Sequence, residues 1–314
     1  MPMLSITADG STLGLHEEHG SLSARLHNAL RRDDGPITIM VHGYKYQPGH
    51  PVHCPHTSLF ASTPAPHPRV AKLARIISWP RHLGLRGQPC EGLGLSFGWH
   101  ARGTIWRAYR QAEQAGVALA DLIALLRQLD PTRQINLITH SLGARVALCG
   151  LERCAPISVQ TAILLAPAEF SQHTRRILMS EQARATQVLC VTSRENDLYD
   201  FLLEQCVAAP SKGDRVIGHE ALRLPNLTTL QLDDPDSLTA LRHLGYYVAA
   251  PTNRICHWSP YLRPGVFPLY RAVLSGTLPL PQLRARLPHR PTPRWSRLLP
   301  RAPRLPANAL AFGR

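Results

Sequence analysis

The sequence predicts an α/β protein with a mostly parallel central sheet flanked by helices on both faces. Short apolar segments of strand length alternate with longer segments that have helical periodicity. Several of the short segments are apolar at nearly every position, which is typical of parallel strands buried on both faces. The expected strands lie near residues 37–42, 74–79, 134–139, 160–166, 187–192 and 227–232. At 314 residues, the chain fits one domain of about 250 residues with a tail better than two domains.

The first expected strand ends in a glycine turn. Residues 36–41 are apolar or β-branched, and His42, Gly43 and Tyr44 follow directly. Because glycine tolerates tight turns, Gly43 allows the backbone N–H of Tyr44 to face a site at the carboxyl end of the strand. An ordinary buried strand that enters a turn would show the same pattern.

Two irregular stretches, residues 45–73 and 80–102, interrupt the alternation of strands and helices. The first is rich in proline and the second in glycine. Long loops in a compact domain usually form lids or binding loops. Because both stretches follow expected strand ends, we expect them to form the wall or lid of a substrate pocket.

The first of these loops also concentrates metal-ligating residue types. A zinc site is one interpretation, because histidine and cysteine are common zinc ligands. The residues concerned are His50, His53, Cys54, His56 and His67. Their spacing matches no standard four-ligand pattern, so we expect neither a metal nor another cofactor.

The strongest helical pattern covers residues 103–129. Its apolar residues recur at three- and four-residue spacings, which gives one buried face. Asp130 and Pro131 end the helix, because proline disfavours helical backbone in the residue before it.

The most informative segment is 134–148, a buried strand followed by a sharp turn and an alanine-rich helix. The turn carries Ser141, and Gly143 fills the last position of a G-x-S-x-G pattern, while Thr139 replaces its first glycine. A serine on such a turn is held in strained backbone with its hydroxyl lifted clear of the sheet. We therefore predict that Ser141 is a nucleophile. The alternative is a serine that caps an ordinary helix.

Backbone N–H groups near this turn predict a site for developing negative charge. The helix after Ser141 directs its N-terminal N–H groups and positive dipole end at the same place. The N–H groups of Leu142 and Tyr44 would together form a two-donor oxyanion hole.

A polar loop after the expected strand 186–192 offers an acid. Asp197 is our choice for the carboxylate that orients a catalytic histidine, because ligand-facing residues of open α/β sheets follow the carboxyl ends of strands. Glu195 and Asp200 are alternatives in the same region. Asp197 also fits the N-cap of a helix that begins near Leu198.

The sequence has 16 histidines, so the catalytic base can be identified only by its position in the chain. The base should follow the acid and lie beyond the last strand. His257 meets both conditions, in a loop at 254–261. His243, in an expected helix at 237–244, is the second choice and His219 the third. A structural histidine beside Trp258 is the alternative for His257.

The order Ser141, Asp197, His257, with His42 and Gly43 after an early strand, resembles the α/β-hydrolase superfamily over residues 36–275. The segments 42–44 and 257–261 are most similar to small bacterial α/β-hydrolases related to the DUF900 group. The resemblance implies an α/β-hydrolase fold and a cofactor-free serine esterase that acts on a small-molecule ester through an acyl-enzyme. It assigns Ser141 as nucleophile, Asp197 as acid and His257 as base.

Two other functions fit the same residues. An acyltransferase would use the same triad with an acceptor other than water. A hydrolase-fold protein with an inactive site would serve instead as a binding module through a basic tail.

The C-terminal region differs in composition from the rest. We expect one domain over 1–278 and a flexible, nonessential tail over 279–314, because this region is rich in arginine and proline and has no acidic residue. The tail contributes to a net charge of +14, so weak contact with anionic surfaces is expected. Specific binding to nucleic acid is not expected, because Trp295 and Phe312 are the only aromatic residues of the tail.

Cysteine usage and hydropathy predict the compartment. The seven cysteines show no paired spacing, which suits a reducing environment. The first 20 residues lack a basic and then apolar signal, and no apolar run reaches about 18 residues. We therefore expect a cytoplasmic bacterial protein without a transmembrane segment.

Overall fold

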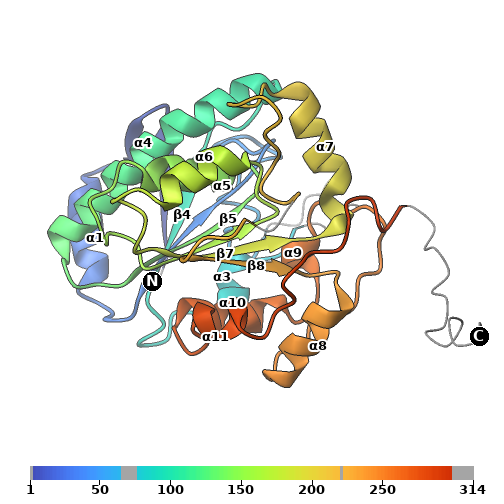
Figure 1. Ribbon diagram of the computed structural model, residues 1–314. Helices are drawn as coiled ribbons and strands as arrows, with labels where there is room; N and C mark the ends of the chain where they lie inside the picture. The colour runs from blue at the N-terminus through green and yellow to red at the C-terminus, as the bar shows by residue number, and fades with distance from the viewer. Residues whose placement is uncertain (1–2, 65–75, 220–221, 299–314) are drawn as a thin grey trace, which may run out of the picture.

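The structure, a computed structural model, describes residues 3–64, 76–219 and 222–298. Its eight strands form one sheet in the order β2-β1-β4-β3-β5-β6-β7-β8 (Figure 1). Every neighbouring pair is parallel except β1 and β2. The strands are β1 (Met3–Asp9), β2 (Thr12–Leu15), β3 (Ile37–Val41), β4 (Leu93–Trp99), β5 (Ile135–His140), β6 (Thr161–Leu165), β7 (Gln187–Thr192) and β8 (Leu227–Gln231). The α/β class and the mostly parallel sheet predicted from the sequence are confirmed.

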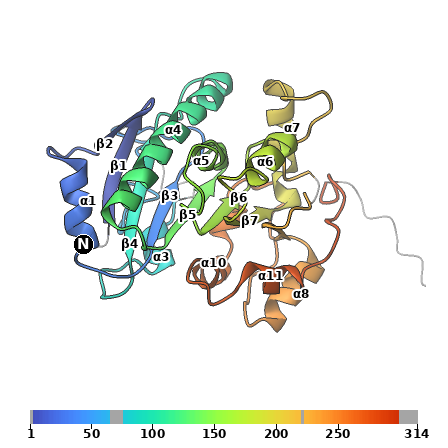
Figure 2. The same ribbon diagram turned by 60° about the vertical axis from the view of Figure 1, so that its left-hand side comes forward.

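Helices cover both faces of this sheet. Figure 2 shows α4, α5 and α6 on one side, and α3, α8, α10 and α11 on the other. The helices are α1 (Leu22–Leu30), α3 (Trp79–Leu83), α4 (Ile105–Leu129), α5 (Gly143–Leu151), α6 (Ser171–Leu178), the 3₁₀ turn η1 (Arg194–Asn196), α7 (Asp197–Cys206), α8 (Pro235–His243), α9 (Ser259–Leu262), α10 (Val266–Leu274) and α11 (Leu280–Arg284).

Two apolar cores follow from this layering. Neighbouring residues of a strand point to opposite faces, so β3 sends Ile39 into the core beneath α4 and α5 and Met40 into the core beneath α3 and α10. Both side chains are fully buried. The long helix α4 matches the expected helix at 103–129 within two residues at its start.

The sequence misplaced the second strand. Residues 93–99, which lie in the expected glycine-rich loop, form β4 between β1 and β3. In the expected strand 74–79, residues 76–78 have no regular structure and the helix α3 begins at Trp79, while residues 74 and 75 lie outside the described residues. Gly98 explains the error: a Cβ there would lie 2.4 Å from His56 Nε2. Glycine in this strand makes room for the 45–64 segment to pack on it. The N-terminal strands β1 and β2 were also missed.

The described part of the expected tail, residues 279–298, is packed on the domain. Leu280, Leu283 and Leu287 are buried in the core on the α10 side of the sheet. Proline prevents a long helix here, but it does not prevent the leucines from packing on β7 and β8. A flexible tail is therefore wrong for 279–298, and residues 299–314 lie outside the described residues.

Candidate active site

Ser141 lies at the turn between β5 and α5, near the carboxyl ends of the central strands. Its φ is +55°, a left-handed backbone that non-glycine residues rarely adopt. The turn is held by two hydrogen bonds, from the Ser141 N–H to the Leu165 oxygen (2.9 Å) and from the Ala168 N–H to the Ser141 oxygen (3.1 Å). The sequence predicted this strained turn, and such strain occurs most often at functional sites.

Two glycines bring this turn against the end of β3. A Cβ on Gly143 would lie 2.7 Å from the backbone oxygens of both Val41 and His42. A Cβ on Gly43 would lie 2.7 Å from the Ser141 Cβ. Real Cβ atoms do not approach so closely, so glycine at both positions is required for the Ser141 turn and the 42–44 turn to meet.

Alanine at position 143 is expected to destabilise the fold by about 1–3 kcal/mol, because the added methyl group must displace backbone carbonyls that cannot rotate away. Urea unfolding of Gly143→Ala measures this loss. Gly14→Ala is the matched control, since a Cβ there meets no heavy atom within 4 Å. Equal unfolding midpoints for the two variants would contradict the expected clash.

His42 fixes the peptide that joins Gly43 to Tyr44. Its Nε2 accepts from the Trp99 N–H (3.0 Å), so its Nδ1 carries the proton and donates to the Gly43 oxygen (2.9 Å). Burial lowers the pKa of His42 to about 3, so the ring stays neutral at ordinary pH. Holding the Gly43 carbonyl also fixes the Tyr44 N–H, because the two groups belong to one planar peptide unit.

The next feature of the site is the pair of expected oxyanion donors. Within the described residues, neither the N–H of Tyr44 nor that of Leu142 donates to a protein acceptor. Both residues adjoin the close approach of Gly43 and Ser141. Their N–H groups therefore remain available to a ligand.

His257 lies beside the residue that precedes Ser141. The ring of His140 is 4.6 Å from the ring of His257, and His140 Nε2 donates to the His257 backbone oxygen (3.0 Å). The ring of Tyr199 also stacks on the His257 ring, and their centres are 4.6 Å apart. Among the described residues, no hydrogen bond joins His257 to Ser141, and such bonds are often long in unliganded enzymes.

Asn196, not Asp197, contacts the His257 ring. The distance from His257 Nδ1 to Asn196 Oδ1 is 2.6 Å. An amide oxygen only accepts, so this contact assigns the proton to Nδ1 and leaves the lone pair of Nε2 free. Burial, with the nearby His140, holds the pKa of His257 well below its usual value, so the ring is a neutral proton acceptor.

The three acidic candidates have other partners. Asp197 accepts from the Trp295 N–H (2.6 Å) and pairs with Arg194 (3.3 Å). Glu195 pairs with Arg263. Asp200 accepts from Asn196 Nδ2 at 2.8 Å. Sequence reasoning missed Asn196 because it considered only carboxylates, although an amide oxygen also accepts from an imidazole N–H.

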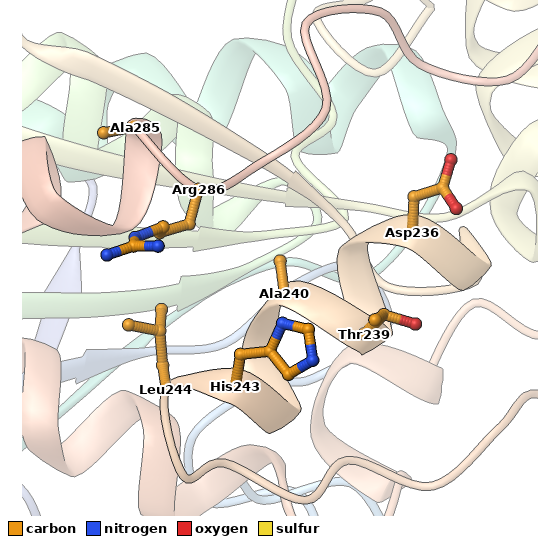
Figure 3. Close-up of a pocket in the computed structure, with 7 residues that line it drawn as sticks. All are labelled: Asp236, Thr239, Ala240, His243, Leu244, Ala285 and Arg286. Atoms are coloured by element: carbon orange, nitrogen blue, oxygen red, sulfur yellow. The ribbon is translucent and has the colours of Figure 1, made fainter.

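The alternative histidines lie in other surroundings. Figure 3 shows His243 on α8, at a surface hollow of about 400 Å³ that α8 shares with the segment after α11. The hollow is lined by Asp236, Thr239, Ala240, His243, Leu244, Ala285 and Arg286, and Ser141 is not among these residues. His219 contacts Arg294 (3.5 Å). Of the three candidates, the structure brings only His257 to the β5 turn.

The 45–64 segment lies next to the 42–44 turn. The rings of Tyr46 and Phe60 lie 5.4 and 6.1 Å from the His42 ring, and the Lys45 N–H donates to the Ala101 oxygen. This segment therefore packs beside the strand ends near the site, and its role as a pocket wall stays a prediction; residues 65–73 of the predicted loop lie outside the described residues. The 80–102 stretch does not form a comparable loop, since its second half is β4.

The part of the chain that the structure describes contains no arrangement of side chains typical of a metal site. Among residues 3–64, 76–219 and 222–298, no group of three or more histidine, cysteine, aspartate or glutamate side chains could hold a metal ion. His67 lies outside these ranges. In the part of the chain that the structure describes, no helix combines the length and apolar character needed to cross a membrane.

No model of a known protein family matches the chain, and a search of curated proteins found no similar sequence.

Proposed function

We propose that the protein is a serine hydrolase of the α/β-hydrolase type that cleaves a carboxylic ester. The observation that carries this proposal is the left-handed backbone of Ser141 at the turn between β5 and α5. A serine gains nothing structural from this strain, whereas a nucleophile gains a position above the sheet at the helix N-terminus. The resemblance of the motifs around Ser141 and His42 to α/β-hydrolases supports the same function.

The chemistry follows from the neighbours of Ser141. His257 Nε2 takes the proton of the Ser141 hydroxyl as its oxygen attacks the ester carbonyl. The oxyanion accepts from the N–H groups of Tyr44 and Leu142. The protonated His257 returns the proton to the leaving alcohol, and an acyl-enzyme remains. Water then attacks the acyl group, with His257 again as base, and releases the acid.

A fluorescent fluorophosphonate tests the proposal directly, because it reacts covalently with an activated serine. Wild type is expected to become labelled, and Ser141→Ala is expected not to. Circular dichroism of both proteins controls for folding. If folded wild type takes up no label, the proposal fails and the inactive binding module becomes the better interpretation. A panel of aryl esters of increasing acyl length would then define the substrate of a protein that is labelled.

A further inference from the structure

A chain of hydrogen bonds extends from His257 to a buried carboxyl group. His257 Nδ1 lies 2.6 Å from Asn196 Oδ1, and Asn196 Nδ2 donates to Asp200 Oδ1 at 2.8 Å. Asn196 caps α7 and Asp200 lies one turn further along the same helix, so their side chains share one face. The Asn196 amide therefore bridges the histidine and the carboxyl group.

The orientation of this amide decides the proton position on His257. If Asn196 presents its oxygen to the ring, Nδ1 must carry the proton and Nε2 is a free base. If Asn196 presents its NH₂ group, Nδ1 must accept, and the proton moves to Nε2. In that second state, His257 cannot take a proton from Ser141. An amide alone has no preference between the two orientations.

Asp200 supplies the preference. A carboxylate only accepts hydrogen bonds, so it requires the NH₂ group of Asn196 and turns the amide oxygen toward His257. We propose that Asp200 is a positioning residue that sets the tautomer of His257 through the Asn196 amide, although it does not touch the histidine. This proposal rests on the hydrolase function proposed above, in which His257 is the base.

The surroundings of Asp200 leave the carboxyl group little freedom. Its side chain is buried. It also lies close to the backbone of Gly218, because a Cβ added there would be only 2.9 Å from Asp200 Oδ2. Asn196 is itself only 3% exposed, so water does not readily replace the contact between the two side chains. The amide therefore depends on Asp200 for its second hydrogen-bond partner.

Protonation of Asp200 would release this control. Burial raises the pKa of Asp200 to about 8. The titratable and charged groups that act on it are Arg194, Asp197, Glu204, Arg294 and the Cys190 thiol on β7. A protonated carboxyl group can donate as well as accept, so it permits both amide orientations. Above this pKa the carboxylate enforces the productive one, so reactivity is expected to rise with pH near 8.

His257 itself does not produce this pH step. Its pKa is held well below the usual value by burial, so the ring is already neutral on both sides of pH 8. A merely structural role for Asp200, such as favourable charge at the N-terminus of α7, would change stability but not the proton position on His257. The tautomer is therefore the readout that separates the two roles.

The experiment compares wild type, Asp200→Asn and the control Asp214→Asn, a buried aspartate that instead accepts from the Gln172 N–H. Long-range ¹H–¹⁵N spectra of ¹⁵N-histidine protein report the tautomer, and His257→Gln identifies the signals of His257. In wild type, the Nδ1–H form is expected to become dominant as pH rises through 8. Asp200→Asn should lose this dependence and label roughly tenfold more slowly with fluorophosphonate at pH 9. Asp214→Asn should behave as wild type.

The outcomes are separable. An unchanged His257 tautomer and an unchanged pH profile in folded Asp200→Asn would overturn the role of Asp200. If Asp200→Asn does not fold, the pH titration of wild type decides alone, because a constant tautomer from pH 6 to 9 would also overturn it. If no form of the protein is labelled, the hydrolase function fails, and the spectra still show whether Asp200 sets the tautomer.

Discussion

Replacing His257 with alanine is expected to slow the reaction of Ser141 with fluorophosphonate by about 10²–10⁴-fold, the usual contribution of a positioned general base. The ring of His257 lies against His140, next to Ser141, and its Nε2 is the free nitrogen. His243→Ala is the matched control, because His243 lies on α8 at a separate surface hollow. The rate of label uptake, measured at a temperature where each variant is folded, checks the prediction. A larger effect at position 243 would show that the base had been misassigned.

The same measurement decides which residue orients the base. Asn196→Ala removes the only hydrogen-bond partner that the described residues offer to the His257 ring, so it should slow labelling strongly. Asp197→Asn should have a smaller effect on labelling and a larger effect on stability, because Asp197 forms a buried ion pair with Arg194. The reverse order would restore Asp197 to the role that the sequence predicted for it.

The sequence predicted the sharp turn that carries Ser141 but not the residue that contacts the His257 ring, for a physical reason. The turn around Ser141 is specified locally, by a buried strand, a small residue at Gly143 and an alanine-rich helix. The choice between Asn196 and Asp197 depends on direction instead. Each residue along a helical turn rotates the side chain by about 100°, so neighbours point to different partners. Here η1 runs directly into α7, and only the folded turn shows that Asn196 faces the histidine.

Composition misled the sequence analysis where polar or glycine-rich segments carry structure. Gly94 and Gly98 made β4 look like a loop, although all seven of its residues are buried and pair with β1 or β3. The proline- and arginine-rich C-terminal segment looked unable to join a core. Its leucines pack nonetheless, since burying three side chains on an existing sheet requires no long helix. Sequence patterns report local conformational preference. The pairing of β4 and the packing of the C-terminal leucines depend instead on residues far away in the sequence.

Removal of residues 285–314 is expected to destabilise the protein by about 5 kcal/mol or more, in contrast to the nonessential tail that composition predicts. Residues 292–295 contact η1 and the start of α7. The Thr292 oxygen accepts from Arg194 Nε (2.8 Å), Arg294 pairs with Glu204 (2.8 Å), and the Trp295 N–H donates to Asp197. The side chain of Glu204 is only 3% exposed, and loss of this segment would leave Arg215 as its single cationic partner among the described residues.

A chain that lacks only residues 299–314 is the matched control, because it keeps all of these contacts. Urea unfolding of the two truncated chains and of wild type measures the difference, and fluorophosphonate labelling reports whether the site survives. The shorter chain should unfold at lower urea and lose its label, since Arg194 and Asp197 flank the residue that orients His257. Equal stability of the two truncated chains would show that the ion pairs and the buried Leu287 contribute little. In that case the C-terminal segment would be dispensable for the domain. Its contacts with Arg194 and Asp197 predict the opposite, that it holds in place the residues around the proposed base.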